Sequence, residues 1–240
     1  MTFDPDPWLS AICGYAVFRA SSPETPPGQD LPAVSGGARA LHYTRVPTTA
    51  VGTVRDLTRL GFGVVDISMT FEREPSTDVG EAADGAVEVG DAREDEGEAL
   101  AEIAASSFSF SRFHSDPDIE PGVAASVKRE WVRSYATGRR GRRLLVARVD
   151  GHPAGFLAEL AVEREGRSVG VIDLVGVGVP WQRRGVGRTL VARWVTSCVG
   201  QYASLRVGTQ AANVPSIRLY EGLGFRLLSS EFVLHAHVGR

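Results

Sequence analysis

Apolar residues recur along the chain with two periods, and each period predicts a different kind of element. Alternating apolar and polar residues, or short valine-rich runs, indicate strands, whereas apolar residues spaced three or four apart indicate amphipathic helices. Strands are predicted at 86–91, 144–149, 154–162, 167–179, 202–209 and 225–235. Helices are predicted at 94–108, 123–135, 183–199 and 214–221. This order predicts an α/β domain with a mixed sheet over residues 86–240.

The first 71 residues form a smaller α/β pattern, with a strand at 39–46, a helix at 51–60 and a strand at 63–71. This pattern copies the end of the larger domain. The segment 55–62 (RDLTRLGF) matches 218–225 (RLYEGLGF), with Leu57 where the later segment has Tyr220. The match predicts that residues 1–71 are a half-domain derived from a partial repeat of the larger one. A chance likeness of two amphipathic helices is the alternative.

Two segments lack apolar periodicity. Residues 72–85 (EREPSTDVGEAADG) are acidic and rich in small residues, and residues 21–37 are dense in proline, glycine and serine. Such composition is typical of linkers and mobile excursions. The predicted organisation is therefore a half-domain at 1–71, a flexible linker at 72–85 and the larger domain at 86–240.

Composition narrows the possible partners. A net charge of −3 at pH 7 gives no reason to expect nucleic acid. No apolar run approaches the roughly 18 residues of a membrane span, and the acidic N-terminus lacks a signal-peptide pattern. Cys13 and Cys198 lie far apart and are predicted to be small buried residues, with no metal site. A cytoplasmic location follows as the default expectation.

The strongest local signal is the segment 177–190 (VGVPWQRRGVGRTL), where a valine-rich strand turns into a helix. Gly185 and Gly187 lack Cβ atoms, so that several backbone N–H groups can point into one concavity at the positive end of the helix. Such a concavity binds phosphate. An ordinary glycine-rich turn with solvated arginines would look the same locally. The spacing fits neither a P-loop nor a dinucleotide fingerprint.

A second motif lies downstream, and the two motifs together are more specific than either alone. The segment Asn213–Phe225 (NVPSIRLYEGLGF) has the pattern Asn-x-x-Ser-x-x-x-Tyr-x-x-x-Gly-Phe, and 182–187 has the pattern Gln-x-x-Gly-x-Gly. With both motifs in this order, the chain resembles the GCN5-related N-acetyltransferases (GNAT). The resemblance implies the GNAT acyl-CoA fold and an acetyl-CoA-dependent N-acetyltransferase. The sequence departs from the family in one respect: the family usually has Val-x-Pro at the end of this strand, whereas here Val179 lies directly before Pro180.

The resemblance also implies residue roles. Tyr220 would be catalytic and would protonate the departing CoA thiolate, since a tyrosine stays protonated at neutral pH. Asn213 would cap its helix. The backbone near a bulged strand end would pair with pantetheine, and the amides of the glycine turn would hold the pyrophosphate. The implied acetyl-CoA contacts are Val177, Val179, Gln182, Arg183, Arg184, Gly185, Val186, Gly187, Arg188 and Asn213.

The segment 108–116 (FSFSRFHSD) indicates which class of acceptor the protein could bind. Arg112 with Phe110 and Phe113 suits an anionic, ring-bearing acceptor such as a nucleotide diphosphate, although a structural helix end with an exposed arginine fits equally. This segment, the later 205–210 (LRVGTQ) and the half-domain in front resemble the dTDP-fucosamine acetyltransferases. That resemblance implies Arg112, Phe113 and His114 as acceptor-binding residues, a dTDP-amino sugar as the partner, and a possible homodimer.

The general base and the acceptor stay open at the level of sequence. Asp173, Glu159, His114 or a water chain could take the proton of the amine. The alternatives to a nucleotide-sugar acetyltransferase are a GNAT enzyme that acts on a peptide, an amino-thiol or an antibiotic amine, and a non-catalytic acetyl-CoA-binding module. An intact Tyr220 disfavours the last of these.

Overall fold

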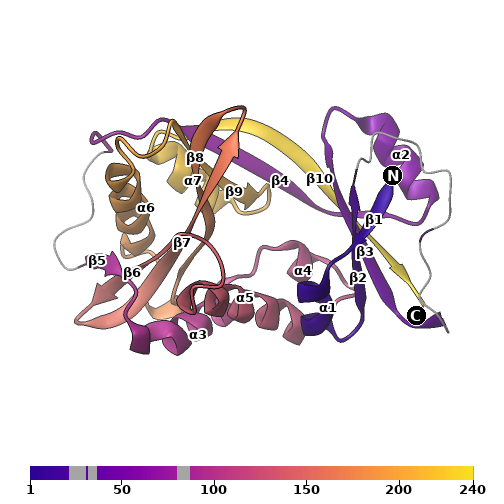
Figure 1. The fold of residues 1–240 in the computed structure, drawn as a ribbon, viewed down its shortest axis with the longest axis horizontal. Coiled ribbons are helices and arrows are strands. Elements are labelled where there is room, and N and C mark those ends of the chain that lie inside the picture. The colour runs from indigo at the N-terminus through magenta and orange to yellow at the C-terminus, as the bar shows by residue number, and fades with distance from the viewer. Residues whose placement is uncertain (22–30, 32–36, 80–86, 240) are drawn as a thin grey trace.

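A computed structural model of the chain describes residues 1–21, 31, 37–79 and 87–239. Within these ranges ten strands form one mixed sheet in the order β1-β2-β3-β10-β4-β9-β8-β7-β6-β5 (Figure 1). The strands are β1 (Thr2–Pro5), β2 (Ala16–Ser21), β3 (Ala40–Pro47), β4 (Gly63–Arg73), β5 (Glu88–Asp91), β6 (Arg143–Val149), β7 (His152–Arg164), β8 (Arg167–Val177), β9 (Ser204–Gln210) and β10 (Arg226–Val238). The helices are α1 (Pro7–Cys13), α2 (Val51–Arg59), α3 (Gly97–Ser107), α4 (Arg112–Ser115), α5 (Pro121–Ala136), α6 (Val186–Ser197) and α7 (Val214–Gly222), with short 3-10 turns at Glu94–Glu96 and Val179–Trp181.

Alternation along β6 shows how the larger part of the sheet is covered. Leu145 and Ala147 point into one apolar cluster, which they share with α6 and α7. Leu144 and Val146 point the other way into a second cluster, with α3 and α5. Because successive strand residues face opposite sides of a sheet, this part of the molecule has three layers with two cores. The mixed α/β fold predicted from the sequence is confirmed.

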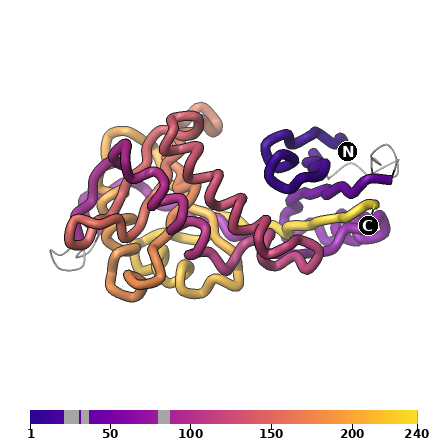
Figure 2. The backbone as a smooth tube through the Cα atoms, turned by 90° about the horizontal axis from the view of Figure 1, so that it is seen from below, coloured from indigo at the N-terminus to yellow at the C-terminus, as the bar shows by residue number. Residues whose placement is uncertain are grey.

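The molecule is elongated, with a larger lobe and a smaller one that contains both termini (Figure 2). The long strands β4 and β10 run from one lobe to the other (Figure 1). β4 comes from the predicted N-terminal half-domain, yet it pairs with β9 on one side and β10 on the other. The two predicted domains therefore share one sheet, and their strands interleave.

The suspected repeat has the same local geometry in both copies. Gly61 and Gly224 adopt φ values of 92° and 81°, in the left-handed region that favours glycine. The amide of Phe62 donates to the carbonyl of Leu57, and the amide of Phe225 donates to that of Tyr220, at 3.1 Å and 3.0 Å. Both phenylalanines are buried. Leu57 and Tyr220 thus occupy the same position in two copies, each of which is a strand, a helix and a strand.

The copies exchange their last strands across a pseudo-twofold axis. β3, α2 and β4 form the first copy, and β9, α7 and β10 form the second. β10 pairs antiparallel with β3, and β4 pairs antiparallel with β9. β4 and β10 pair with each other in the middle of the sheet. Each copy is completed by the strand of the other.

Several boundaries differ from the sequence predictions. The elements β1, α1 and β2 were not predicted, although Asp6 caps α1 and Pro7 occupies its first turn, which is a helix-start signal. The predicted strand 167–179 ends at Val177, and the predicted helix 183–199 begins at Val186 because Gly185 is left-handed. β4 includes the first two residues of the predicted linker. The predictions of flexible segments at 72–85 and 21–37 concern mainly residues 80–85, 22–30 and 32–36, which lie outside the described residues.

The remaining structural expectations concern cysteines and membrane spans. Both cysteines are free thiols; Cys198 is buried as predicted, whereas Cys13 is only half-buried. Within the described ranges, none of the helices combines the length and apolar character that crossing a bilayer requires.

Candidate active site

A bulge in β8 opens the sheet at the centre of the larger lobe. Leu174 pairs with Ala158 and Ile172 pairs with Glu159, so that Asp173 is an extra residue without a partner on β7. The parallel pairing of β8 with β9 ends at Ile172 and Val207. A bulge bends its strand and increases the local twist. Beyond Asp173, β8 therefore diverges from β9 and leaves a gap in the sheet.

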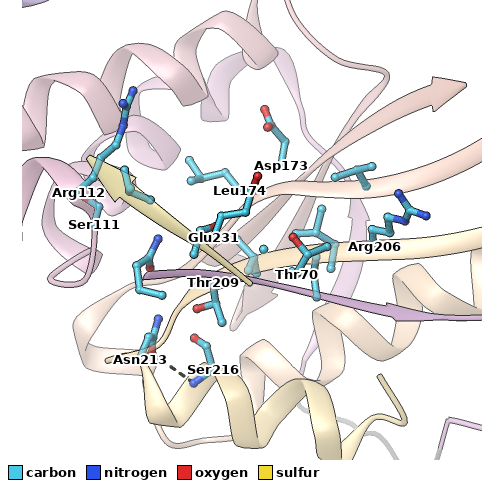
Figure 3. Close-up of a pocket in the computed structure, with 18 of the residues that line it drawn as sticks. Thr70, Ser111, Arg112, Asp173, Leu174, Arg206, Thr209, Asn213, Ser216 and Glu231 are labelled. Carbon is cyan, nitrogen blue, oxygen red and sulfur yellow. Dashed lines mark hydrogen bonds between the residues drawn. The ribbon is translucent and has the colours of Figure 1, made fainter. Parts of the chain in front are cut away.

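A cavity of about 700 Å³ lies at this gap (Figure 3). Leu174 and Val175 of β8 line it together with Gly208 and Thr209 of β9. Residues of β4, β10, α4, α5 and α7 complete its walls. The cavity thus has walls from both copies of the repeat and from the segment 108–113 that the sequence singled out.

Tyr220 lines the cavity from α7 and is 2% exposed. The rings of Phe71 and Phe225 lie 6.2 Å and 6.0 Å from its own ring. Burial raises the pKa of Tyr220 above its usual value, and a hydrogen bond with Ser216 only partly opposes this effect. The hydroxyl therefore keeps its proton throughout the physiological range and is available as a donor.

Asn213 begins α7 and lines the same part of the cavity. Its side-chain oxygen accepts a hydrogen bond of 3.3 Å from the amide of Ser216, which is the N-cap expected from the sequence (Figure 3). This cap fixes the first turn of the helix that carries Tyr220. It also fixes the loop between β9 and α7 beside the gap.

The predicted pyrophosphate turn connects the 3-10 turn after β8 to α6 and lies next to α7. Arg183 and Gly185 have φ values of 60° and 82°, and α6 begins at Val186. A Cβ atom on Gly187 would lie 3.5 Å from a methyl of Val177 and 3.8 Å from Leu219. The first amides of a helix have no partner within the helix, so this turn presents free donors at the positive end of the α6 dipole.

The other residues predicted to contact acetyl-CoA are spread around this turn. The side-chain amide of Gln182 donates to the carbonyl of Val177 at 3.1 Å and ties the turn to β8. Arg188 donates to the carbonyl of Gly222, and the Arg184 guanidinium lies 5.3 Å above the Trp181 ring. Val177 ends β8 and pairs with Gly155, whereas Val179 lies in the 3-10 turn that follows. The cavity is lined by β8 residues that lie closer to the bulge than these two valines. The contacts of Val177, Val179, Gln182, Arg184 and Arg188 with acetyl-CoA stay a prediction.

Replacing Gly185 with alanine is expected to raise the KM for acetyl-CoA about tenfold, because left-handed backbone costs a non-glycine residue roughly 1–2 kcal/mol and the amides of the turn would be re-aimed. Steady-state kinetics with varied acetyl-CoA measure this. Gly200→Ala is the matched control, since Gly200 has a φ of 76° and open space around it, beyond the end of α6. Equal KM values for the two variants would contradict the assigned role of the turn.

Arg112, another residue that lines the cavity, lies against two aromatic rings. Its guanidinium carbon is 3.9 Å from the Tyr43 ring centre and 4.5 Å from that of Phe113. Burial lowers the pKa of Arg112 to about 10, so the group is still charged at pH 7. Phe113 is itself a buried core residue. His114 hydrogen-bonds the Ser111 hydroxyl at 2.7 Å, and burial, followed by the charge of Lys128, lowers the pKa of His114.

A cluster that sequence reasoning missed supports Arg112 from behind. One oxygen of Asp116 lies 2.6 Å from His235 Nδ1 and 2.8 Å from His237 Nε2. Burial alone would raise the pKa of Asp116, but these two hydrogen bonds hold it well below its usual range. Burial lowers the pKa of His235 to about 4, so that this imidazole is neutral at pH 7. Its Nε2 lies 3.5 Å from Arg112 Nη1 and can accept from it.

The same three side chains bring possible metal-ligand atoms within 4.8 Å of one another. The neighbouring guanidinium of Arg112 disfavours a further cation there, and its hydrogen bond with His235 assigns Nδ1 as the nitrogen that carries the proton. We therefore describe the cluster as a hydrogen-bonded support for Arg112. Its sequence signal is the His-x-His spacing in β10, which places both imidazoles on one face.

The carboxylates that the sequence offered as a general base are engaged elsewhere. One oxygen of Asp173 accepts from Trp131, Tyr135 and Arg140, at 2.7, 2.8 and 2.8 Å. Glu159 is buried and accepts from the Tyr202 hydroxyl at 2.5 Å. Asp66 of β4, which the sequence did not single out, also lines the cavity, and burial raises its pKa. A raised pKa suits a carboxylate that takes a proton near neutral pH.

Comparisons with known proteins agree with this arrangement. Residues 98–225 match the family model described as Acetyltransferase (GNAT) family. The spore coat polysaccharide biosynthesis protein SpsD of Bacillus subtilis (strain 168) is 31% identical over 144 residues, which cover 60% of this chain and 48% of that protein. The chain thus spans about half the length of this curated relative.

Two solved structures illustrate the likeness of fold. A GCN5-related N-acetyltransferase from Kribbella flavida has a TM-score of 0.57 and 20% identity, covering 82% of this chain and 68% of that chain. A tandem GNAT protein from the clavulanic acid biosynthesis pathway has a TM-score of 0.55 and 14% identity, covering 83% of this chain and 64% of that chain.

Proposed function

The chain belongs to the GNAT acetyltransferase family, and from that premise we propose that it transfers the acetyl group of acetyl-CoA to the amine of a nucleotide-linked amino sugar of the dTDP-4-amino-4,6-dideoxyhexose type. One observation carries the proposal. A single cavity is lined by Tyr220 and Asn213 of the predicted acetyl-CoA site and by Arg112, which is stacked on aromatic rings. The first two residues suit a thioester, and Arg112 with its rings suits an anionic, ring-bearing acceptor.

The name of the curated relative supports the same class of acceptor. SpsD is a polysaccharide biosynthesis protein, and sugars enter polysaccharides as activated nucleotide derivatives. The relative covers 60% of this chain, so the similarity extends beyond the acetyl-CoA motifs alone. This support concerns the class of substrate rather than the individual sugar.

The proposed reaction is a direct attack. The lone pair of the acceptor amine forms a bond to the thioester carbonyl carbon, and the carbonyl π electrons move to oxygen. Backbone N–H groups of β8 near Leu174 and Val175, where β9 no longer pairs, are suited to stabilise this oxyanion. Collapse of the intermediate breaks the C–S bond, and Tyr220 gives its proton to the departing thiolate. Asp66 or a water chain takes the proton from the amine.

A panel of dTDP- and UDP-linked amino sugars, assayed by release of CoA, tests the proposal. We expect 4-amino dTDP-sugars to give a kcat/KM at least about a hundredfold above that of simple amines, because binding energy from the nucleotide is used at the reacting centre. Peptides, amino-thiols and antibiotic amines complete the panel. Turnover of these acceptors with none of the nucleotide sugars would replace the proposed substrate class.

A further inference from the structure

The cations that line the cavity differ in whether a carboxylate neutralises them. Arg206 donates to Glu72 at 2.5 Å, and Arg45 lies 3.8 Å from Glu231. Lys128 and Arg112 line the same cavity, and Lys128 is buried whereas Arg112 is half-buried. Among the described residues, neither has a carboxylate within ion-pair distance. The end of the cavity near α4 and α5 therefore has two positive charges, one buried and one half-buried, that form no ion pair within the described part of the chain.

Lys128 is the more buried of the two, with 7% of its surface exposed. Its ammonium lies 4.7 Å from the Phe108 ring centre and 5.0 Å from that of Trp131. Rings of this kind attract a cation weakly but cannot replace an anion or water. Burial, followed by the charge of Arg112, lowers the pKa of Lys128 to about 8. An unpaired buried charge is costly, so its presence in a cavity wall indicates a ligand of opposite charge.

The other charged groups around Lys128 do not offer that charge. The negative charge of Asp173 in β8 acts to raise the pKa of Lys128. One oxygen of this carboxylate already accepts hydrogen bonds from Trp131, Tyr135 and Arg140. His114 of α4 is a neighbour with a lowered pKa and brings no negative charge. No carboxylate among the described residues is thus left to neutralise Lys128, and the position suits a bound anion.

We propose that Lys128 and Arg112 together bind a diphosphate carried by the acceptor. The two cations have complementary geometries. The planar guanidinium of Arg112 presents paired donors, and its orientation is fixed by Tyr43, Phe113 and His235, whereas the Lys128 ammonium is a compact charge. Aromatic walls exclude water and strengthen both interactions. The inference rests on the proposed function only for the source of the diphosphate, a nucleotide sugar.

Binding of this kind couples to a proton. The free Lys128 is about half protonated near pH 8, and a bound diphosphate stabilises the ammonium and raises its pKa. Binding near pH 8 is thus expected to take up a proton. Affinity is highest below pH 7, where Lys128 is already charged, and falls as the pH rises through about 8. An ordinary exposed lysine would give no such dependence below about pH 10.

The sequence makes this directly measurable, because Lys128 is the only lysine in the chain. Incorporation of lysine labelled with ¹³C at Cε gives one lysine signal, which can be titrated with pH in the full chain. We expect a midpoint near 8 for the free protein. Saturating dTDP-glucose, which has the diphosphate but no amine to acetylate, should move the midpoint upward by about one unit or more. Inorganic pyrophosphate should shift it in the same direction.

Two substitutions separate charge from packing. Lys128→Met should weaken dTDP-glucose binding about tenfold to a hundredfold at pH 7, the range of a charge-assisted hydrogen bond, and should abolish the pH dependence. Lys128→Arg should keep most of the affinity and remove the dependence, since a guanidinium does not titrate in this range. Arg129→Met is the matched control: it removes a charge from the same helix, where Arg129 pairs with Glu102 at the surface. It should change neither quantity.

The outcomes distinguish this inference from the proposed function. A lysine signal that does not respond to dTDP-glucose or pyrophosphate, or equal affinities for Lys128→Met and Arg129→Met, would overturn the diphosphate site even if amino sugars are turned over. A responsive Lys128 together with no turnover of any nucleotide amino sugar would retain the site and overturn the proposed substrate.

Discussion

Replacing Tyr220 with phenylalanine is expected to lower kcat about 10²- to 10⁴-fold, the usual contribution of a general acid. The hydroxyl is the only group removed, while the ring keeps its contacts with Phe71 and Phe225. The affinity for acetyl-CoA should therefore stay within about threefold, because in the proposed mechanism Tyr220 acts on the thiolate that forms only as the C–S bond breaks. Because burial raises the pKa of Tyr220, its deprotonation should also produce no falling limb in kcat of the wild type between pH 6 and pH 9.

Tyr202→Phe is the control for this measurement. Tyr202 is another buried tyrosine of the same lobe, and its hydroxyl hydrogen-bonds Glu159 and Arg142 away from the cavity. Its loss should lower stability and leave kcat near the wild-type value. If Tyr220→Phe retained kcat within about twofold, the proton would reach the thiolate by another route and the assignment of Tyr220 would fail.

Replacing Glu96 with alanine is expected to lower the free energy of unfolding by about 3–5 kcal/mol, since it leaves a buried arginine unpaired. Arg148 of β6 donates to both oxygens of Glu96, each at 2.6 Å, and both side chains are buried. Arg148 also donates to the carbonyl of Asp91, and Glu96 accepts from the amide of Arg93. The pair fixes the start of α3 to the sheet. Denaturant unfolding followed by circular dichroism measures the loss.

The same pair gives the stability a pH dependence of known sign. The hydrogen bonds from Arg148 hold the pKa of Glu96 below its ordinary value of 4.5. A carboxyl with a depressed folded-state pKa stabilises the protein above its unfolded pKa, and this contribution is lost as the pH falls below 4.5. Glu102→Ala is the control, because Glu102 is exposed and its pair with Arg129 lies at the surface. Similar destabilisation in the two variants would contradict a special role for the buried pair.

Local signals in the sequence predicted the structure around Tyr220 more completely than that around Arg112. The cap at Asn213, the left-handed glycine at Gly224 and the buried Phe225 are all fixed within one short segment. Around Arg112, the side chains of Arg112, Lys128 and His235 come from α4, α5 and β10. The periodicity of apolar residues predicts single elements, but it does not predict which elements contact each other. Lys128 directly follows Val127 of the predicted apolar stripe of its helix, so its burial was not evident from the pattern.

The interleaving of the two halves escaped prediction for a related reason. The repeated strand–helix–strand pattern was visible in the sequence. A pattern of apolar residues, however, predicts which face of a strand is buried and not which strands pair with it. β10 has β3 and β4 as partners, whose residues lie more than 150 positions earlier in the register. The missed elements β1, α1 and β2 are different, since Asp6 and Pro7 carried a helix-start signal that could have been used.

The position of β10 has a consequence for the order in which the chain acquires its structure. During synthesis residues 1–73 leave the ribosome long before the strand that lies between β3 and β4, because β10 begins at Arg226. Until it arrives, both strands have an open edge that can pair with another chain. Loop-closure entropy makes such distant pairings slow to form. The nascent protein is therefore exposed to aggregation until β10 has been made, and a chain whose synthesis stops before residue 226 would have its central sheet unclosed.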